Sequence, residues 1–499
     1  MKKFLPDLIA ILAFIILSFA YFFPADIEGR ILFQHDTAAG VGAGQESKEY
    51  LERTGERTRW TNSIFGGMPT YQMSPSYDST TSLKGVEKVY RLFLPDYVVL
   101  TFIMMLGFYI LLRAFGISAW LAGLGGVIWA FSSYFFILIP AGHIWKFVTL
   151  AYIPPTIAGV VLAYRKKYLL GGIVTALFIA LQIQSNHIQM SYYFMFVILF
   201  FVGAYFEDAY KKKELPHFFK ASGVLALAAV VGVCINISNL YHTYEYSKET
   251  MRGKSELKQE GAAASQTSSG LDRDYITNWS YGIGETLTLL VPNVKGGGSG
   301  STMSQSEAAM AKANPMYNGI YSQLPQYFGE QPWTAGPVYV GAFVMFLFVL
   351  GCFIVKGPLK WALLGATIFS ILLSWGKNFM GLTDFFIDYV PMYNKFRAVS
   401  SILVIAEFTI PLLAIFALKE ILSKPDTLKL KENRGGVIAT LVLTAGVALI
   451  LAVAPGAFFS GFITTQEMAA LKQALPAEHL APFVANLTEM REAIIASDA

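Results

Sequence analysis

Residues 144–206 read IWKFVTLAYIPPTIAGVVLAYRKKYLLGGIVTALFIALQIQSNHIQMSYYFMFVILFFVGAYF and contain three apolar runs, interrupted first by RKK and then by QSNH. An α-helix needs roughly 20 mainly apolar residues to cross a bilayer, and each run is close to that length. Basic residues concentrate in the short cytoplasmic loops of membrane proteins. The stretch therefore predicts three consecutive membrane-spanning helices, the first two joined by a cytoplasmic turn and the last two by an external one.

Similar runs recur throughout the chain. They lie near residues 4–23, 97–114, 119–139, 144–164, 168–184, 188–206, 218–240, 337–355, 359–375, 398–418 and 435–455. Only 14% of the 499 residues are charged and 54% are hydrophobic, whereas soluble proteins carry about 25% charged residues. No small-residue cleavage pattern follows the first run, so we read it as an uncleaved helix and not as a signal peptide. We predict an all-α polytopic membrane protein with about eleven transmembrane helices.

Basic residues predict the orientation. With a cytoplasmic N-terminus, every short cytoplasmic loop contains Lys or Arg, and shifting the count by one helix would place these residues outside. They are Arg113, Arg165, Lys166, Lys167, Lys211, Lys212, Lys213, Lys220, Lys356, Lys360, Lys419, Lys424, Lys429, Lys431 and Arg434. The small net charge of +4 thus indicates topology and not a nucleic-acid partner.

The predicted topology leaves three large segments outside the membrane. In order, the chain comprises a first transmembrane helix (1–23), a first extracytoplasmic loop (24–96), helices 2–7 (97–240), a second extracytoplasmic loop (241–336), helices 8–11 (337–455) and an extracytoplasmic tail (456–499). KGGGSGSTMSQSE in the second loop indicates local disorder, and the tail pattern predicts one or two amphipathic surface helices. The unequal halves argue against an inverted-repeat transporter.

Several classes of site are excluded by their missing motifs. The chain contains no Walker-type loop, Gly-rich dinucleotide fingerprint, CxxC pair or HExxH, so cytosolic nucleotide chemistry is unsupported. Its two cysteines, Cys234 and Cys352, lie within apolar runs. The outer loops therefore have no disulfide framework.

A carboxylate follows the first helix closely. The sequence ILFQHDTAAG ends an apolar stretch at His35 and Asp36. Asp before Thr-Ala-Ala is a good helix N-cap, and the alternative is a carboxylate held near the membrane surface for chemistry. Asp36 on its own does not decide between these readings.

Two further polar groups lie at the predicted outer ends of helices. In GHIWK, His143 and Lys146 share one face of a helix start, where Lys146 either snorkels to lipid head groups or binds phosphate. In LQIQSNHIQMSYY, a cluster of amides with His187 and Gln189 exceeds what an ordinary polar turn with an aromatic belt requires.

The second half of the chain adds two candidates. Glu285 lies in an otherwise apolar stretch, as a second carboxylate or as a structural hydrogen-bond acceptor. In YVPMYNKFRAVS, Lys395 and Arg397 lie at the outer boundary. Arg suits bidentate phosphate binding, and snorkelling is the competing explanation.

Five pieces of the sequence resemble one known family. They are HD at 35–36, GHIWK at 142–146, NHIQMSYY at 186–193, NWSYGIGETLTLLVPN at 278–293 and QYFGEQPWTAGPVYVGA at 326–342. In this order they resemble the YfhO family of bacterial membrane proteins, which is grouped with the GT-C class of polyprenyl-phosphate-sugar-dependent glycosyltransferases. Members of this kind often continue further, so we expect that the chain is a fragment or a short form.

The resemblance implies a GT-C-like fold in the bacterial inner membrane and sugar transfer on its outer face. It implies an undecaprenyl-phosphate-linked sugar donor, a polymer, glycolipid or protein acceptor in the cell envelope, and contact with membrane lipids. In GT-C enzymes an acidic residue of the first outer loop is the general base, and Asp36 matches that position. The first loop lacks an uninterrupted DxD, so a divalent cation is left open.

The remaining roles rest on boundary position and local pattern. We assign His143, Lys146 and Arg397 to the phosphate, and His35, His187, Gln189 and Glu285 to the sugar or acceptor pocket. Two other functions use the same groups: a transporter or flippase of a lipid-linked saccharide, which needs no general base, and a non-catalytic envelope assembly protein.

Overall fold

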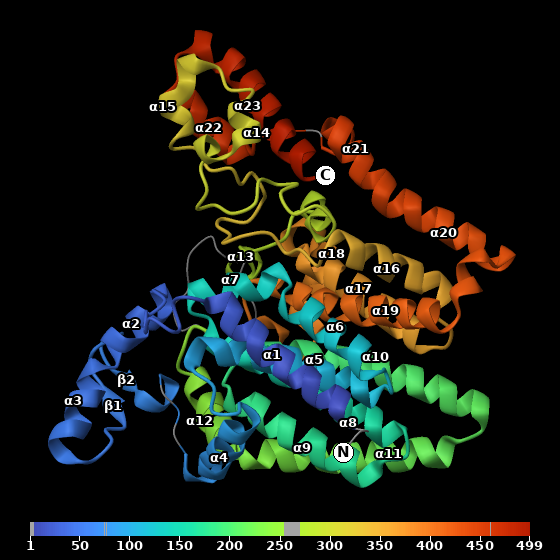
Figure 1. Cartoon of the computed structure of the whole chain (residues 1–499). Helices are drawn as coiled ribbons and strands as arrows, with labels where there is room; N and C mark the ends of the chain where they lie inside the picture. Colours follow the sequence, from blue (N-terminus) through green and yellow to red (C-terminus); the bar gives the residue numbers. More distant parts are fainter. Residues whose placement is uncertain (1–3, 74, 76, 254–269, 460) are drawn as a thin grey trace. The chain divides into compact units, whose positions relative to one another are not determined.

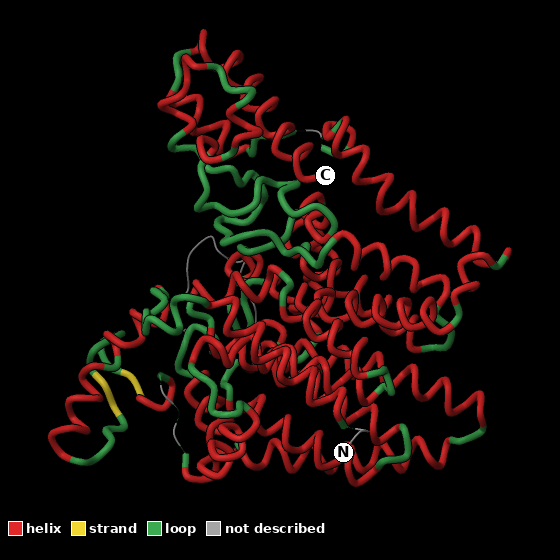
Figure 2. The backbone as a smooth tube through the Cα atoms, viewed as in Figure 1, coloured by secondary structure: helices red, strands yellow, loops and turns green. Residues whose placement is uncertain are grey.

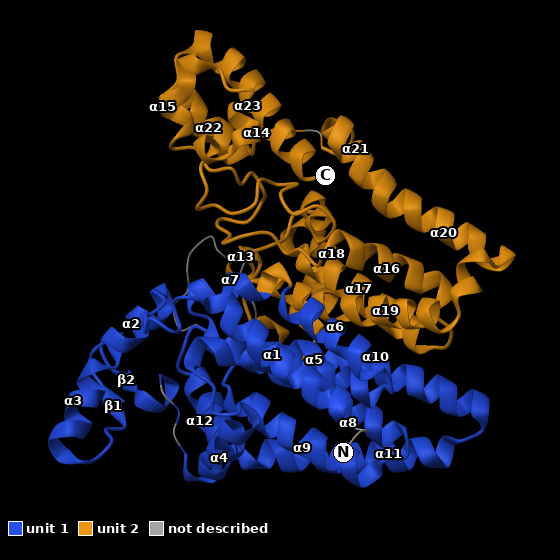
Figure 3. Ribbon diagram, in the orientation of Figure 1, with its two compact units in different colours: residues 1–131, 135–256 blue, residues 132–134, 257–499 orange. Residues whose placement is uncertain are grey.

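The computed structural model describes residues 4–73, 75, 77–253, 270–459 and 461–499. Two compact units divide the chain (Figure 3): unit 1 is Met1–Phe131 with Phe135–Glu256, and unit 2 is Ser132–Tyr134 with Leu257–Ala499. Helices dominate both units (Figure 2). Within the described residues the only strands are β1 (Trp60–Thr61) and β2 (Met68–Pro69), an antiparallel pair.

Unit 1 is built on long apolar helices. They are α1 (Leu5–Phe22), α5 (Asp96–Ala114), α6 (Ala119–Ala130), α7 (Ser133–Ala141, whose first two residues belong to unit 2), α8 (Ile144–Tyr164), α9 (Tyr168–Gln184), α10 (Ile188–Lys212) and α11 (Leu215–Ile235). Helix α8 is buried along nearly its whole length between α5, α9 and α10. Its contact with α9 is close because both helices carry glycine, and a Cβ on Gly171 would lie 2.7 Å from the Gly159 carbonyl oxygen. Small residues allow membrane helices to approach in this way.

The segment at residues 24–96, predicted to be extracytoplasmic, folds into short elements. It contains α2 (His35–Ala43), α3 (Gln45–Thr54), the β1–β2 pair, the 3₁₀ turns η1 (Thr70–Gln72) and η2 (Asp78–Thr80), and α4 (Thr81–Tyr90) (Figure 1). Helix α12 (Ile237–Ser247) continues α11 after a break at Asn236. The ring of Tyr77 stacks on His242 of α12, and Gln72 Nε2 donates to Thr243 Oγ1 at 3.4 Å. The segment is therefore fastened to the helices on which the site is built.

Unit 2 has its own apolar helices. They are α16 (Ala342–Ile354), α17 (Leu359–Ser374), α19 (Val404–Ser423), α20 (Arg434–Leu441) and α21 (Val447–Val453), with a π-helical turn at Val442–Gly446 joining the last two. Helix α19 packs against α16 and α17 and is almost wholly buried. The 3₁₀ turns η7 (Tyr393–Lys395) and η8 (Val399–Leu403) precede α19, and η9 (Pro425–Lys429) and η10 (Lys431–Asn433) follow it.

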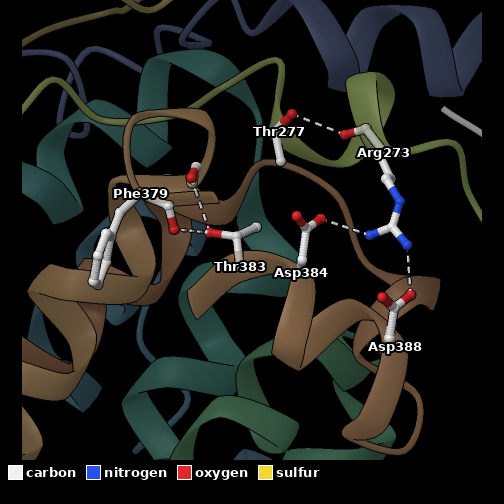
Figure 4. Close-up of polar contacts among 7 residues, drawn as sticks. Arg273, Thr277, Phe379, Thr383, Asp384 and Asp388 are labelled. Atoms are coloured by element: carbon white, nitrogen blue, oxygen red, sulfur yellow. Dashed lines mark hydrogen bonds and ion pairs between the residues drawn. The ribbon is translucent and has the colours of Figure 1, made fainter. Parts of the chain in front are cut away.

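A sharp bend follows α17. The turn η6 (Gly376–Phe379) leads into α18 (Met380–Tyr389), and the two helical segments are bent by 109°. Gly376 has a φ of +46°, and a Cβ there would overlap Ser280 Oγ. Thr383 Oγ1 of α18 donates to the Gly376 carbonyl at 2.9 Å (Figure 4). Glycine is thus required at the bend for both conformation and space.

The tail of unit 2 folds together with the described part of the second predicted loop, residues 270–336. The segment contains α13 (Arg273–Thr277), η3 (Gly284–Leu289), η4 (Met303–Gln305), α14 (Glu307–Met310), η5 (Pro315–Tyr317) and α15 (Asn318–Tyr321), and the tail contains η12 (Pro455–Ala457), α22 (Thr465–Ala474) and α23 (Ala477–Asp498). Met303, Tyr321, Phe483 and Met490 share one buried cluster. The tail forms two helices, as predicted, but α23 is not confined to the surface, because it buries one face against α14. Helix α22 buries only Leu471.

The predicted disorder at 295–307 is also wrong. Ser299 N–H donates to the Thr334 carbonyl and Gln326 N–H to the Ser301 carbonyl, both at 2.8 Å. Thr302 and Gln305 form a capping box. Gly296 and Gly297 have positive φ values, so the glycines serve tight turns in an ordered loop.

Each apolar run of the sequence coincides with helix, but not every helix is long enough to count as a span. Within the described residues, seven helices are long and apolar enough to cross a membrane, or up to nine if the bent pairs α6–α7 and α17–α18 each form one span. Helices α9 (17 residues) and α16 (13 residues) are shorter. The structure thus supports a helical, multi-pass membrane protein, and the total of eleven spans stays a prediction.

Candidate functional site

Asp36 lies in the first turn of α2, and Gln34 occupies the N-cap position. The reading of Asp36 as an N-cap is therefore wrong. Gln34 Nε2 donates to the Ile139 carbonyl at 2.7 Å, and Thr37 Oγ1 donates to Gln34 Oε1 at 2.9 Å. Because the first of these bonds is buried, Gln34 fixes the start of α2 against the end of α7.

The carboxylate of Asp36 meets the turn between α7 and α8. Its Oδ2 lies 3.1 Å from Nε2 of His143, which occupies the N-cap position of α8. Gly142 precedes His143 with a φ of +81°, and a Cβ there would lie 3.0 Å from Thr37 N and 3.1 Å from Asp36 Cβ. A glycine at this turn lets α2 approach closely enough for the pair to form.

The Asp36–His143 pair is open to its surroundings. The two side chains are 55% and 48% exposed. His35, the other predicted histidine of this loop, is 86% exposed with Nδ1 3.6 Å from Asp36 Oδ1. An accessible carboxylate that is held in position by an imidazole can accept a proton from a bound hydroxyl group.

Lys146 is in the first turn of α8, one turn after His143, and only 9% of its surface is exposed. A lysine that snorkels keeps its ammonium group in contact with water or head groups. The burial of Lys146 disfavours that explanation. It leaves a cation enclosed beside the histidine.

The turn between α9 and α10 carries the next polar groups. Asn186 adopts a φ of +59° and accepts a hydrogen bond from Asn239 Nδ2 at 3.1 Å, which ties the turn to α12. Gln189 Nε2 donates to the Tyr193 hydroxyl at 2.9 Å. Within the described residues, His187 Nδ1 and Gln184 Oε1 are buried without a hydrogen-bond partner. Buried polar atoms are rarely left unsatisfied, so this turn has hydrogen-bonding capacity for a ligand.

His187 is electrostatically linked to the α8 start. Burial, followed by the positive charge of Lys146, lowers the pKa of His187 to about 3. A smaller effect comes from His143. The imidazole is therefore neutral at physiological pH. Unit 1 brings Asp36, His143, Lys146 and His187 together at the starts of α2, α8 and α10.

Glu285 belongs to unit 2 and acts there as a structural acceptor. Its carboxylate accepts from Gly282 N–H at 2.6 Å, from the Tyr327 hydroxyl at 2.6 Å and from Glu330 N–H at 3.3 Å, and it is 2% exposed. Burial and the Glu285 carboxylate raise the pKa of Tyr327 well above its usual range. Of the two readings of Glu285, the structural one fits this geometry.

Arg397 is also in unit 2, where it rests on aromatic rings. Its Nη1 donates to the Tyr275 hydroxyl at 2.7 Å, and the guanidinium carbon lies 5.4 Å from the Tyr275 ring centre and 5.9 Å from that of Trp279. Arginine stacks on aromatic rings through its planar face, whereas it binds anions through the N–H groups at its edge. Its assignment to phosphate stays a prediction.

Two charged residues of unit 2, Arg273 and Glu407, were not predicted from the sequence. Arg273 holds α18 through Asp384 at 2.7 Å and Asp388 at 2.6 Å, one helical turn apart (Figure 4). Glu407, fully buried in α19, accepts from Ser132 Oγ. A glutamate inside the apolar run 398–418 was a visible signal for a special site, whereas the Arg273 bridge depends on a bend that the sequence pattern does not show.

In the part of the chain that the structure describes, no group of three or more His, Cys, Asp or Glu side chains could hold a metal ion.

Comparisons with family models, curated proteins and solved structures gave no match.

Proposed function

We propose that this protein is a membrane glycosyltransferase of the GT-C type, similar to the YfhO family, and that it acts at the outer face of the bacterial inner membrane. In this proposal eleven spans place the N-terminus in the cytoplasm. The observation that carries the proposal is the Asp36–His143 pair, at 3.1 Å, beside the buried Lys146. These groups supply a proton acceptor and a cation at one helix end.

The proposed reaction transfers a sugar from a polyprenyl-phosphate-linked donor to a hydroxyl of a cell-envelope acceptor. The acceptor oxygen forms a bond to the anomeric carbon, and the bond from that carbon to the phosphate oxygen breaks. The acceptor proton passes to the Asp36 carboxylate, while the polyprenyl phosphate leaves with the bonding electron pair. A positioned general base contributes about 10²–10⁴-fold in such steps.

Lys146 is assigned to the leaving phosphate. Negative charge accumulates on that oxygen as the bond breaks, and a cation in a site with little water stabilises it more than one in bulk solvent. His187 and Gln189 are assigned to the sugar. The neutral His187 ring and the partnerless Gln184 carbonyl oxygen suit hydroxyl groups, which both donate and accept hydrogen bonds.

Transport of the same lipid-linked saccharide is the competing function, and detergent solution separates the two. Purified full-length protein in detergent has no second compartment, so it would consume a polyprenyl-phosphate-linked sugar only by chemistry. We expect donor loss with release of polyprenyl phosphate in the presence of an acceptor extract from the cell envelope. Intact donor in detergent, together with its movement across proteoliposomes, would establish the transporter instead.

A further inference from the structure

A cavity of about 330 Å³ lies at the other end of α8, where Tyr164 and Arg165 meet the ends of α10 and α11. With a rise of 1.5 Å per residue, the 21 residues of α8 separate it from the Asp36–His143 pair by roughly 30 Å. The volume is at the lower end of the range for small-molecule sites, roughly 300–1,000 Å³. All of its lining residues belong to unit 1.

The cavity wall is rich in charge. Its ionisable residues include the cations Arg165, Lys166 and Lys212 and the carboxylates Asp208 and Glu214. Lys166 Nζ lies 2.9 Å from Glu214, and Lys212 Nζ lies 2.7 Å from Asp208. The two lysines are therefore neutralised in pairs, and Arg165 supplies the excess positive charge.

One hydrogen bond orients the Arg165 side chain and leaves other N–H groups of its guanidinium able to donate. Its Nη1 donates to the Ala114 carbonyl at the end of α5. Among the described residues this is the only hydrogen bond of its side chain, and no acidic side chain pairs with it. The rest of the planar guanidinium can donate to oxygen atoms of one anion.

The histidine of the cavity has a structural role. His217 Nε2 lies 2.8 Å from the Tyr164 carbonyl, and Nδ1 lies 2.7 Å from the Tyr168 hydroxyl. A carbonyl only accepts, so Nε2 carries the proton and Nδ1 accepts from the tyrosine. The ring is held in place by both nitrogens, which leaves anion binding to Arg165, while the two lysines balance the neighbouring carboxylates.

Apolar surface adjoins this charged cavity. The stacked rings of Tyr164 and Tyr205, with centres 4.5 Å apart, form part of its wall together with Phe218. Phe206 and Phe219, the next residues along α10 and α11, are 45% and 63% exposed. A ligand with a small polar head and an apolar tail fits this arrangement better than a soluble anion does.

We propose that this cavity binds the phosphodiester head group of a membrane phospholipid, with Arg165 donating to the phosphate. Asp208 and Glu214 accept from the donor groups of the head, such as glycerol hydroxyls, and the acyl chains follow the apolar surface beside Phe206 and Phe219. Basic pockets between membrane helices bind anionic lipid head groups in the same manner. The proposal is independent of the glycosyltransferase assignment, because it uses the opposite end of α8.

The chain offers a matched pair of lysines for the test. Lys211 and Lys212 are neighbours on α10, and each bridges a carboxylate four residues earlier, but only Lys212 lines the cavity. Lys211→Ala and Lys212→Ala therefore change the net charge equally. We expect Lys212→Ala to weaken binding of phosphatidylglycerol about fivefold, and Lys211→Ala to leave it unchanged.

Two further variants act in opposite directions. Arg165→Gln removes the main phosphate donor and is expected to weaken binding about tenfold or more. Glu214→Gln releases Lys166 from its carboxylate and is expected to tighten binding of an anionic lipid. Full-length protein in detergent is titrated with phosphatidylglycerol, phosphatidylcholine and inorganic phosphate, and bound lipid is counted by native mass spectrometry.

Retention of phosphatidylglycerol above phosphatidylcholine, lost in Arg165→Gln and Lys212→Ala, would support the proposal. Equal lipid retention in Lys211→Ala and Lys212→Ala would overturn it. Inorganic phosphate displacing the lipid at equal concentration would also overturn it, because the cavity would then be a site for a soluble anion.

Discussion

The Asp36 carboxylate lies 3.1 Å from the His143 imidazole, which joins the first turn of α2 to the first residue before α8. This contact joins the segment at residues 24–96 to the start of the buried helix α8. The approach depends on Gln34, which binds the Ile139 carbonyl, and on the bare backbone of Gly142. The Asp36–His143 contact therefore depends on both Gln34 and Gly142, and each residue can be substituted separately.

Gly142→Ala is expected to reduce the proposed transfer activity about tenfold or more, since small displacements of a reacting group are costly. The new methyl group would press on Thr37 and Asp36, and alanine is disfavoured at positive φ by about 1–2 kcal/mol. Activity and the apparent melting temperature of purified protein measure the two effects. Gly40→Ala in α2 is the control, because nothing lies within 4 Å of its new Cβ. Equal activity of both variants would contradict the role given to Gly142.

Lys146→Met is expected to weaken binding of the lipid-linked donor about 10- to 100-fold, as the loss of a hydrogen bond to a charged group predicts. Methionine preserves most of the buried apolar volume. Transfer rates measured over a range of donor concentrations give KM and kcat for each variant. Lys84→Met, on the exposed side of α4, is the control for net charge. An unchanged KM together with an unchanged kcat in Lys146→Met would remove this lysine from the phosphate site.

Stability near His187 is expected to depend on pH. Its pKa is lowered to about 3 in the folded chain and is about 6.5 when unfolded. The unfolded chain therefore binds a proton first, so stability is fully present above about pH 6.5 and is lost as the pH falls from there toward about 3. His187→Gln cannot titrate, and its apparent melting temperature should fall less than that of the wild type between about pH 7.5 and about pH 5. Identical decreases would show that His187 is not held neutral.

The stability of the part of unit 2 that contains α22 and α23 is expected to depend on Arg491. This arginine is fully buried, binds both Glu467 oxygens at 2.7 Å and lies 4.8 Å from the Phe328 ring centre. Arg491→Met leaves the partly buried Glu467 carboxylate without its ion-pair partner and should cost about 3 kcal/mol. Hydrogen exchange of α22 and α23 is the measurement.

Asp384→Asn is the matched comparison for an exposed bridge. Its carboxylate is 43% exposed, and Arg273 keeps Asp388 as a partner, so the expected cost is only about 0–1 kcal/mol. The importance given to the buried pair would be contradicted if Arg491→Met reduced hydrogen-exchange protection of α22 and α23 less than Asp384→Asn reduces that of α18.

Much of the helical architecture could be predicted because apolar runs report membrane helices directly. The bends could not, because they depend on contacts between distant residues. Gly376 is one glycine among many in the sequence, and only the position of Ser280 shows why α17 must turn there. The tail was misjudged for the same reason, since the partner that buries α23 comes from residues near 303–321.

The candidate site shows the same division. Asp36, His143 and Lys146 were predictable from residue type at helix boundaries, where charge requires a reason. Gln34 was not, because a glutamine in a loop has no distinctive pattern until its bond to Ile139 is seen. The sequence left Glu285 open between a pocket carboxylate and a structural acceptor, and its three hydrogen bonds with Gly282, Tyr327 and Glu330 fit the second reading.

The measurement that tests the account most directly compares Asp36→Asn with the wild type in donor consumption by purified full-length protein in detergent. Asn has nearly the same shape and cannot take the acceptor proton, so we expect the same melting behaviour and a rate at least about 10²-fold lower. Glu52→Gln, an exposed carboxylate of the same outer segment, should retain the wild-type rate. A folded Asp36→Asn variant that consumes the donor at the wild-type rate would contradict the proposed general base.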